Sequence, residues 1–482
     1  MKRLVSRILF FAIVLAAYGF HSNAENSIGY YNEPLRPQYH FTAKKNWLND
    51  PNGLVFYKDE YHLFYQHNPF ENEWGFMHWG HAVSGDLVHW KHLPIAIDPD
   101  DGSKDKAKCT AFSGSAAIDE NNSSGLQKGG EKTLVAFYTS WQCGQRMAYS
   151  NDGGRTWTKY EGNPVIPLAN DDARDPRIFW HKPSQQWVIA LYRRPDNDES
   201  KNGVSFYVSS NLKQWRWTSH IVGFFECPDI FELPIVGEKE AAKWILLGGN
   251  GEYMIGSFDG QEFHKESGKY VLDYGANFYA SQTWNGIPEA DGRRIQIAWM
   301  SGGKYPDSPF NQQMSFPCQL TLRHTEEGLR VYREPVEEIA SLYEKTQEWK
   351  QEKLAPGKNL LSSIKGDLFD IQGEFSLQNA AQLGFRVRKG KDSEGFPIVY
   401  DAKKAELSCL GKTAPLKPVD GRIKLRILLD RSSIEVFGNG GRIAMSSCFV
   451  PGKGEELEIF AQEGEAEIVE LVVNKLKSAW RE

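Results

Sequence analysis

One short turn recurs four times in this chain, and its spacing constrains the fold more than any other sequence feature. Each copy is a Ser-x-Asp or Ser-x-Asn turn followed by an aromatic residue that can pack between sheets. The copies lie about 50 to 65 residues apart, the scale of one four-stranded blade of a β-propeller. They are Ser84-Gly85-Asp86 with Trp90, Ser150-Asn151-Asp152 with Trp157, Ser209-Ser210-Asn211 with Trp215, and Ser257-Phe258-Asp259 with Phe263. Four copies, with room for one more unit before Arg333, predict a propeller of five blades.

The domain organisation follows from changes in pattern along the chain. Short apolar runs broken by Gly, Asp, Asn and Pro fill residues 25–333, which is typical of an all-β domain. Residues 334–352 place charged side chains around Ile339, Leu342 and Tyr343, and this predicts a short amphipathic linker helix. Alternating polar and apolar runs then return, as in 423–429. We therefore predict an all-β protein with a five-bladed β-propeller at 25–333 and a β-sandwich at 353–482.

The first 24 residues resemble a secretory signal peptide. They contain a positive start, an apolar run and a small-residue cleavage site, at Lys2, Arg3 and Arg7, at 8–20, and at Ser22-Asn23-Ala24. The apolar run is shorter than a typical membrane span, and no cysteine precedes Cys109 to attach a lipid. We expect an exported protein, periplasmic or secreted, without membrane insertion; a retained membrane anchor is the alternative.

Charge and cysteine content limit the classes of partner. The formal net charge is −6, and loss of residues 1–24 removes three positive side chains and no acidic one, which leaves −9. A nucleic-acid partner is therefore not supported. The six cysteines contain no CxxC pair, so a zinc ribbon is not expected. An exported chain can oxidise some of them, and Cys409 and Cys448, which lie in the same late region, are a candidate pair.

Three carboxylates lie beside proline and next to a large apolar run. Asp50 lies in Asn49-Asp50-Pro51-Asn52-Gly53, where Pro51 and Gly53 favour a rigid turn that could hold a nucleophile or a metal ligand. Asp175 lies between Arg174 and Pro176, with Arg177 following, and these arginines favour its ionised form. Glu226 follows Phe224-Phe225, and burial among apolar groups raises the pKa of a carboxyl, which suits a general acid. Exposed turn residues, a structural ion pair and a strand-edge residue are the respective alternatives.

A propeller would bring these carboxylates together, because the innermost strands of all blades line one central funnel. Asp50, Asp175 and Glu226 would come from three different blades. Two carboxylates that face one bond are the minimum equipment of most glycoside hydrolases. Aromatic side chains at Trp47, Trp74, Phe112 and Trp299 could offer flat apolar faces to a sugar, although most tryptophans fill cores.

These motifs, in this order, resemble those of glycoside hydrolase family 32, the family of invertases, levanases and inulinases. The matching stretches are Asn49-Asp50-Pro51-Asn52-Gly53, Arg174-Asp175-Pro176 and Glu226-Cys227-Pro228, supported by Leu63-Phe64-Tyr65-Gln66, Trp74-Gly75, His78-Trp79-Gly80-His81, Phe112-Ser113-Gly114-Ser115-Ala116 and the late 430–437. The resemblance spans nearly the whole chain after residue 24. It implies a propeller followed by a sandwich, in agreement with the pattern above.

The resemblance also implies a retaining mechanism on β-fructofuranosides. It makes Asp50 the nucleophile that attacks C2 of a fructosyl unit, Glu226 the acid/base, and Asp175 a stabiliser of the transition state. It places Asn49, Gln66, Trp74, Phe112, Ser113 and Arg174 around the terminal fructose. Two departures from the pattern occur: Leu48 stands where the family often has Met, and Asn277 stands where many members have Asp. The second weakens inference about subsites beyond the first.

Three other functions fit the sequence less well. The stretch 150–157 resembles the Asp-box of sialidases, but the three acid motifs argue against that chemistry. Metal catalysis is not expected, because no HExxH spacing occurs among His62, His67, His78, His81, His89 and His92. A non-catalytic fructan-binding protein would be expected to have lost one of the three acids, and none is lost.

Substrate choice is the finest prediction. Export favours a polymer or oligomer met outside the cytoplasm, so we predict a fructan β-fructosidase that acts on levan or inulin, with sucrose as a further candidate substrate. A narrow propeller funnel would be closed on its inner side, so a chain end should enter first, and we predict exo-action that releases terminal fructose. Endo-levanase, endo-inulinase, invertase and fructosyltransferase share the same site and are the alternatives. We expect no cofactor and no metal, and the sequence leaves the oligomeric state open.

Overall fold

The computed structural model describes residues 30–100, 106–168 and 172–480. The predicted signal peptide lies outside these residues. In these described ranges strands make up almost all of the regular structure, with three short 3-10 helices beside them: η1 (Pro195–Asn197), η2 (Glu199–Lys201) and η3 (Glu337–Leu342). Within the described ranges, no helix is both long and apolar enough to cross a membrane.

Five separate sheets form the first domain, in the order of the chain. The first contains β1 (Asn46–Tyr57), β2 (Glu60–Asn68), β3 (His78–Ser84), β4 (Lys91–Ile97) and β19 (Phe310–Asn311); the second contains β5 (Ala111–Asp119), β6 (Thr133–Ser140), β7 (Gly144–Ser150) and β8 (Thr158–Lys159). The third contains β9 (Asp172–His181), β10 (Gln186–Arg194), β11 (Gly203–Ser209) and β12 (Arg216–Val222). The fourth contains β13 (Asp229–Pro234), β14 (Ala242–Leu247), β15 (Glu252–Phe258) and β16 (Phe263–Val271), and the fifth β17 (Tyr279–Thr283), β18 (Arg294–Trp299), β20 (Cys318–Thr325) and β21 (Gly328–Pro335).

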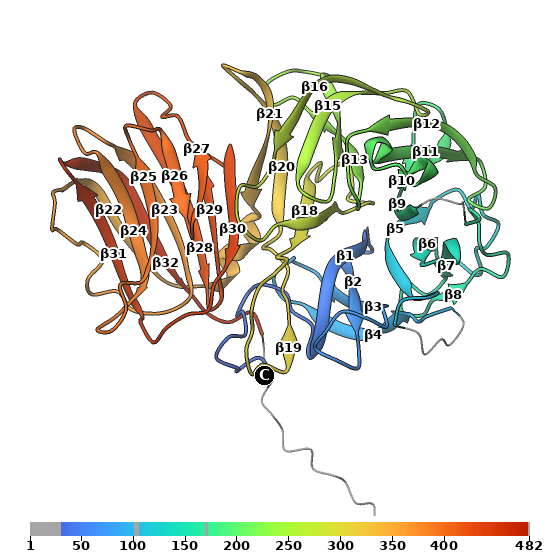
Figure 1. Ribbon diagram of the computed structural model, residues 1–482, viewed down its shortest axis with the longest axis horizontal. Coiled ribbons are helices and arrows are strands. Elements are labelled where there is room, and N and C mark those ends of the chain that lie inside the picture. Colours follow the sequence, from blue (N-terminus) through green and yellow to red (C-terminus); the bar gives the residue numbers. More distant parts are fainter. Residues whose placement is uncertain (1–29, 101–105, 169–171, 481–482) are drawn as a thin grey trace, which may run out of the picture.

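These sheets stand around a common centre as a propeller (Figure 1). The first strand of each sheet in the chain, namely β1, β5, β9, β13 and β17, lies innermost, and contacts run between β1 and β5, β5 and β9, β1 and β17, and β13 and β17. Strand β19 adds a short parallel pair to the inner edge of β1. The inner strands therefore line a central channel, as the sequence predicted.

The recurring turn occupies the same place in four sheets, between the third and the outermost strand. In three copies the serine hydroxyl accepts a hydrogen bond from the backbone N–H two residues later, at 3.1 Å for Asp86, 3.4 Å for Asp152 and 3.1 Å for Asn211. Asp152 also accepts from the backbone N–H groups of Arg155 and Thr156, so the sialidase-like box is a structural turn. The sequence repeat thus marks the outer hairpins and not the site.

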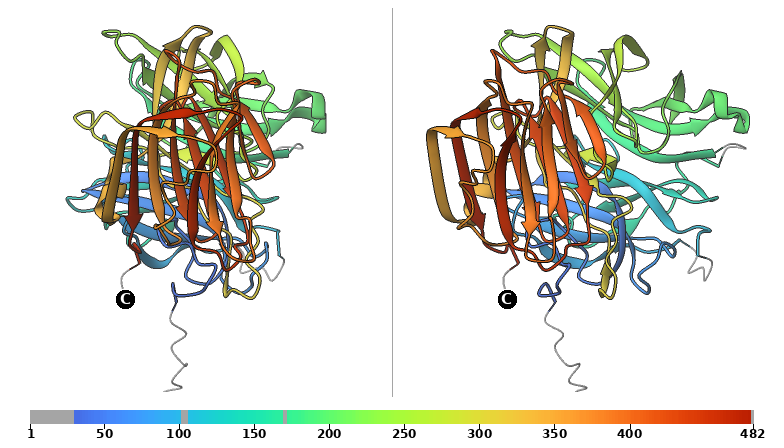
Figure 2. Two further views of the ribbon diagram at one scale, coloured as in Figure 1. Left: turned by 90° about the vertical axis from the view of Figure 1, so that its left-hand side faces the viewer. Right: turned by 60° about the vertical axis from the view of Figure 1, so that its left-hand side comes forward.

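A two-sheet sandwich follows the propeller and stands against one side of it (Figures 1 and 2). One sheet contains β22 (Tyr343–Leu354), β32 (Ala466–Leu476), β23 (Phe369–Ser376), β28 (Arg422–Asp430), β29 (Ser433–Gly438) and β30 (Ile443–Cys448). The other contains β27 (Lys412–Pro415), β26 (Glu406–Cys409), β25 (Phe396–Asp401), β24 (Gln382–Lys389) and β31 (Glu456–Gln462). All pairs within both sheets are antiparallel.

The predicted linker helix over 334–352 is largely wrong. Only η3 is helical, and from Tyr343 the chain forms β22, which pairs along its length with β32. The charged residues of this segment lie on an exposed edge strand, where Trp349 and Leu354 still pack on the sandwich core. Pairing with β32 overrides the helical preference of Glu and Lys. The first strand of the sandwich therefore starts at Tyr343, earlier than the predicted residue 353.

A shared apolar core joins the two domains. Phe41 and Phe316 of the propeller side belong to the same buried cluster as Leu428, Phe437 and Ala444 of the sandwich. The 3-10 helix η3 contributes Ile339 and Leu342 to this cluster. Because the cluster crosses the domain boundary, the sandwich covers apolar surface that the propeller would otherwise expose to water.

The cysteine pairing differs from the candidate pair in the sequence. A disulfide joins Cys109 and Cys143, which lie 34 residues apart in the chain. Cys409 and Cys448 are free, because Cys409 packs in the sandwich core, whereas Cys448 ends β30 beside Asn277 and Tyr305.

A buried ionic network holds the N-terminal segment against the sandwich. His40 hydrogen-bonds to Asp430 at 2.9 Å and to Glu435 at 2.8 Å, and all three side chains are fully buried. Burial alone would lower the pKa of His40, but the bonds to Asp430 and Glu435 raise it to about 9. Burial would raise the pKa of Glu435, but His40 and Arg333 lower it to about 2. Both ring nitrogens face carboxylates, so His40 is held as the imidazolium ion.

This network predicts a bounded pH window of stability. The contribution of His40 is complete below its ordinary pKa of 6.5 and is lost as the pH rises towards about 9. The contribution of Glu435 is complete above its ordinary pKa of 4.5 and is lost as the pH falls towards about 2. We expect His40→Gln to lower the free energy of unfolding by roughly 3 kcal/mol between these limits and to abolish the decline on the alkaline side.

Chemical denaturation from about pH 5 to about pH 9.5 measures this effect. The control is His89→Gln, because His89 pairs only with the partly exposed Asp86 of a surface turn. Equal alkaline slopes for the wild type and His40→Gln would show that His40 is not charged in the folded state.

Candidate active site

The inner strands set the depth of each side chain in the channel. Side chains two residues apart on a strand face the same way, so Ser113, Ser115 and Ala117 of β5 lie at three successive depths. On β9 the corresponding residues are Asp175, Arg177 and Phe179. Ser113 contacts Asp50, and Asp175 is itself one of the three acids. At the other end of the channel, Ala117 and Phe179 line a cavity. The three acids of the sequence motifs all lie at one mouth of the propeller.

Asp50 lies on β1 and is surrounded by hydrogen-bond donors. Its Oδ2 accepts from Ser113 Oγ at 2.5 Å, and its Oδ1 accepts from Asn49 Nδ2 at 3.0 Å. Trp47 Nε1 donates to Asn49 at 2.8 Å and so fixes the amide. Burial raises the pKa of Asp50, the bonds from Ser113 and Asn49 lower it, and the pKa remains above its ordinary value.

The turn expected around Asp50 is an irregular part of a strand. Pairing of β1 with β2 shifts register between Leu48 and Pro51 and again between Asn52 and Val55. Bulges of this kind redirect side chains, which aims Asp50 into the mouth. Gly53 is required here, since it has a φ of 56° and an added Cβ would lie 2.6 Å from the Phe64 ring.

Asp175 is the most buried of the three acids, with 7 % of its surface exposed. Its Oδ2 accepts from the backbone N–H of Cys227 at 3.1 Å, and Arg174 Nε lies 3.9 Å from the same oxygen. Burial raises the pKa of Asp175 to about 7, although Arg174 opposes this shift. The expectation that both neighbouring arginines keep it ionised is therefore wrong in part, because Arg177 points down the channel and pairs with Asp229 at 2.7 Å.

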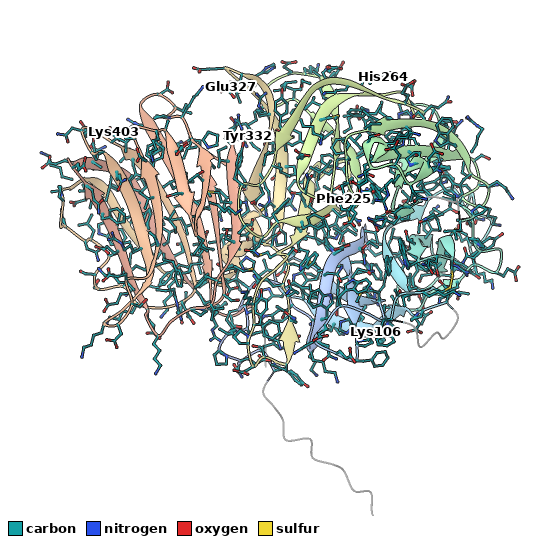
Figure 3. The ribbon with its side chains drawn as sticks, viewed as in Figure 1. Lys106, Phe225, His264, Glu327, Tyr332 and Lys403 are labelled. Atoms are coloured by element: carbon teal, nitrogen blue, oxygen red, sulfur yellow. A yellow bond between two sulfur atoms is a disulfide. The ribbon has the colours of Figure 1, made fainter. Side chains whose placement is uncertain are left out.

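Glu226 lies on the connection between β12 and β13, and its surroundings are polar. Arg174 Nη2 donates to its Oε1 at 2.7 Å, and the hydroxyl of Tyr279 donates to its Oε2 at 2.8 Å. The apolar pocket expected from Phe224-Phe225 does not form around it. Phe224 turns into a core cluster, whereas Phe225 is 42 % exposed and lies near the centre of the propeller (Figure 3).

The three acids lie close enough to act on one another. Cys227 Sγ lies 3.5 Å from Asp50 Oδ2 and 3.4 Å from Asp175 Oδ2, and the charge of Glu226 raises the pKa of both acids. Asp175, Glu226 and Cys227 all have left-handed φ angles, of 62°, 52° and 41°. Such a conformation costs about 1–3 kcal/mol for a residue with a side chain and is concentrated at functional sites. The backbone is thus strained where it aims the acids at each other.

Aromatic side chains form a wall beside the acids. Phe112 stacks on Trp141 with ring centroids 5.3 Å apart, and Trp74, which is 45 % exposed, meets Phe112 edge-on at 5.7 Å. Across the mouth, Trp47 meets Trp299 edge-on at 6.1 Å. These rings present apolar faces to the opening of the channel. Stacked and edge-on rings of this kind favour contact with the C–H faces of a sugar ring.

The remaining predicted binding residues divide into two groups. Asn49, Ser113, Trp74, Phe112 and Arg174 lie at the mouth, as described above. Gln66 is buried instead, with 2 % of its surface exposed, and its amide donates to the carbonyl of Ala111 at 2.8 Å. Gln66 therefore supports the start of β5, the strand that carries Phe112 and Ser113.

Several residues at the mouth carry no local sequence signal. Tyr279 begins β17 and bonds Glu226, and Trp141 follows β6 and stacks on Phe112. Tyr192 lies directly opposite Arg174 in the pairing of β9 with β10, and the guanidinium lies 4.6 Å from its ring centroid. Only cross-strand pairing could have indicated Tyr192, and that pairing requires the register to be known.

Asn277 and Leu48, the two residues that depart from the family pattern, are both buried. Asn277 is buried at the domain boundary, where its side chain donates to the Ser301 carbonyl at 2.5 Å and accepts from the Cys448 N–H at 2.8 Å. It therefore ties the propeller to β30 and does not meet the three acids in any described contact. Leu48 is fully buried in the core cluster that crosses the domain boundary.

The clustered histidines do not gather around one point. His62 and His81 contact each other at 3.0 Å inside the first sheet, and burial lowers the pKa of His62 to about 4. His67 bonds the carbonyl of Trp47, and His92 bonds Tyr31. Among the residues that the structure describes, no group of three His, Cys, Asp or Glu side chains is arranged to hold a metal ion.

Comparison with known proteins identifies the family. Residues 40–335 match the N-terminal domain model of glycosyl hydrolases family 32, and residues 338–475 match the C-terminal model of the same family. The chain belongs to glycoside hydrolase family 32. It is 42 % identical to a levanase of Bacillus subtilis (strain 168), over 99 % of this chain and 76 % of the relative. It is 31 % identical to an extracellular exo-inulinase of Aspergillus niger over the full length of both chains.

Solved structures agree with this assignment. An exo-inulinase from Aspergillus awamori superposes with a TM-score of 0.84 at 30 % identity, over 93 % of this chain and all of that chain. A fructofuranosidase from Schwanniomyces occidentalis complexed with fructose gives 0.83 at 28 % identity, over 93 % and 99 %. The family 32 member described here is therefore a glycoside hydrolase that acts on β-fructosyl bonds, and its propeller-plus-sandwich fold is confirmed.

The short hydrogen bond from Ser113 to Asp50 generates a pH prediction. This bond lowers the pKa of Asp50 against the effect of burial, so Ser113→Ala should raise that pKa. A hydrogen bond to a charged group is worth about 1.5–3 kcal/mol, so the acidic limb of the kcat/KM profile should move to higher pH by about one to two units. Initial rates of sucrose hydrolysis across pH measure the shift.

Ser115→Ala is the matched control, because Ser115 lies two residues along the same strand and bonds the backbone around Pro176. It removes a buried hydroxyl one layer deeper without touching Asp50. An acidic limb that stays in place in Ser113→Ala would mean that the ionisation of Asp50 does not control this limb.

Proposed function

We propose that this enzyme is an exo-acting fructan β-fructosidase with a retaining mechanism, in which Asp50 is the nucleophile, Glu226 the acid/base and Asp175 the stabiliser of the transition state. The observation that carries the proposal is that three carboxylates meet at one mouth: Cys227 Sγ contacts both Asp50 and Asp175, and the charge of Glu226 acts on both of these acids. A nucleophile and an acid that face one glycosidic bond are what retention requires.

The environment of Asp50 supports the role of nucleophile. Ser113 and Asn49 each donate to one carboxylate oxygen, so the ionised form is stabilised inside the site. These bonds also fix the carboxylate plane, which holds an oxygen ready to attack C2 of a bound fructosyl unit. The covalent fructosyl–enzyme intermediate would form by this attack as the bond from C2 to the leaving oxygen breaks.

The environment of Glu226 supports an exchange of protons in both half-reactions. As the acid, Glu226 gives its proton to the leaving oxygen; as the base, it takes a proton from the water that attacks the intermediate. Arg174 and Tyr279 donate to its two oxygens and stabilise the carboxylate form that exists between these steps. The same donors hold its rotamer, so the proton is delivered and recovered at one place.

The environment of Asp175 supports the role of transition-state stabiliser, because positive charge develops in the fructosyl ring during cleavage. The transition state of glycoside cleavage has oxocarbenium character, and a carboxylate held at a fixed distance stabilises positive charge in a site that excludes water. Burial of Asp175 strengthens this interaction because the local dielectric is low. Its backbone N–H donates to Thr139 Oγ1 at 2.9 Å, which anchors the strained residue.

A buried polar layer below the acids supports exo-action. Arg177 pairs with Asp229, and its Nη2 donates to Thr283 at 3.1 Å and to Asn285 at 3.0 Å. Asn285 in turn donates to the backbone of β5 and β9. This layer links the inner strands and separates the acids from a cavity of about 730 Å³ at the other end of the channel. Because the channel is blocked below the acids, substrate reaches them only from the mouth, and this favours entry of a chain end.

The substrate and the location are proposed by analogy with the relatives. The levanase and the exo-inulinases are named for levan and inulin, and the Aspergillus niger enzyme is named as extracellular. We therefore assign levan and inulin as substrates, with sucrose as a smaller one, and export to the periplasm or the medium.

Early digestion products test the exo mode directly. We expect fructose to dominate the first products of inulin and levan, because an exo-enzyme releases one terminal residue at each turnover. Anion-exchange chromatography of samples taken at low conversion measures this, with Asp50→Asn as the enzyme blank. A ladder of oligosaccharides that appears before fructose would make the enzyme an endo-levanase or endo-inulinase.

A further inference from the structure

Arg174 is held on three sides at the mouth of the propeller. Its Nη1 bonds Asp172, its Nη2 bonds Glu226 at 2.7 Å, and its Nε lies 3.9 Å from Asp175. The guanidinium carbon lies over the Tyr192 ring, 4.6 Å from its centroid. A guanidinium has five donors in a rigid fork, so its orientation decides which edge meets the acids.

Strand geometry explains how Asp172 reaches this guanidinium. Asp172 and Arg174 lie two residues apart on β9 and face the same way. A bulge follows, because register shifts between the pairs Arg174–Tyr192 and Arg177–Ala190. The left-handed φ of Asp175 lies within this bulge, which lets the consecutive side chains of Arg174 and Asp175 both approach the site.

Asp172 is itself fixed by a second arginine. Arg194 lies directly opposite Asp172 in the pairing of β9 with β10, and its Nη2 bonds Asp172 Oδ2 at 3.0 Å. The side chain of Asp172 is only 10 % exposed, so both of its oxygens are committed to guanidinium groups in a poorly solvated place. Charges of Arg194, Asp172, Arg174 and Glu226 therefore alternate in sign along one chain of contacts.

We propose that Asp172 is a positioning residue for the reaction: it holds the outer edge of the Arg174 guanidinium so that the inner edge meets Glu226. The inference rests on the proposed role of Glu226 as acid/base. Asp172 also offsets part of the positive charge that Arg174 brings to the mouth. Arg194 balances Asp172 from outside.

The groups that face Arg174 allow the sign of this effect to be worked out. They are Asp172, Asp175, Tyr192, Phe225, Trp141 and Glu226, with Arg194 one contact further out. Removal of the charge of Asp172 leaves the mouth more positive, which favours negatively charged groups there. Removal of the charge of Arg194 leaves Asp172 unbalanced and has the opposite sign.

The test is the pH profile of kcat/KM on sucrose and inulin for two variants. Asp172→Asn should lower kcat/KM by about 10- to 100-fold, since a misplaced contact group costs this order of rate. Its alkaline limb should move to lower pH by about 0.5–1 unit, and that of Arg194→Gln should move to higher pH. The opposite signs separate charge tuning from damage to the fold, and either variant alone suffices if the other does not fold.

Two further variants make the outcome decisive. Glu199→Gln is the matched control, because Glu199 is the other carboxylate near Arg194, at 3.8 Å, and is 84 % exposed; it should behave as the wild type. Glu226→Gln tests the underlying role, and wild-type rates for it would overturn the proposed function itself. Suppose that Glu226→Gln is inactive while Asp172→Asn keeps the wild-type alkaline limb, whatever its reaction rate. The positioning role of Asp172 is then overturned, and the proposed function stands.

Discussion

The two-residue period of the five inner strands is the constraint on which the rest of the structure depends. Because alternate residues of a strand face the channel at successive depths, one strand can contribute a group to the acid mouth and another to the polar layer below it. Ser113 and Ser115 on β5 follow this rule, as do Arg177 and Phe179 on β9 beyond the bulge. Bulges at Asp50 and Asp175 add the exceptions that catalysis needs. The outer strands, the recurring turns and the sandwich hold these five strands in place.

Three carboxylates at one mouth repel each other, which raises the free energy of the folded protein. Hydrogen-bond donors around the acids offset this repulsion. Asp50, Asp175 and Glu226 repel one another in a place where water is largely excluded. Only Arg174 brings a full positive charge into direct contact with them among the described residues, and it is shared between Asp175, Glu226 and Asp172. Neutral donors from Ser113, Asn49, Tyr279 and the Cys227 backbone supply the rest. Each acid therefore has a different balance of burial and donors, and different roles follow from that difference.

Local sequence patterns predict much of this structure, whereas the remainder depends on which strands pair in the folded protein. The Ser-x-Asp turns and the three acid motifs are contiguous in sequence, so the all-β fold and the acids could be predicted. Tyr279, Tyr192 and Asp172 meet the site through strand register, which the sequence does not display. The segment 343–354 is rich in Glu and Lys, yet pairing with β32 makes it a strand. The polar surroundings of Glu226 also depend on distant donors, so Phe224-Phe225 misled the prediction.

The central claim is that Asp50 forms a covalent bond to the fructosyl unit within this mouth. The most direct measurement is mass spectrometry of peptides from Glu226→Gln enzyme that has been quenched during reaction with an aryl β-fructofuranoside. An aryl leaving group needs little protonation, whereas release of the intermediate needs the missing base, so the adduct should accumulate. The account predicts one fructosyl group on the peptide that contains Asp50, and its absence after Asp50→Asn. A fructosyl group on the peptide that contains Asp175, or product formed without any adduct and with inversion at C2, would contradict it.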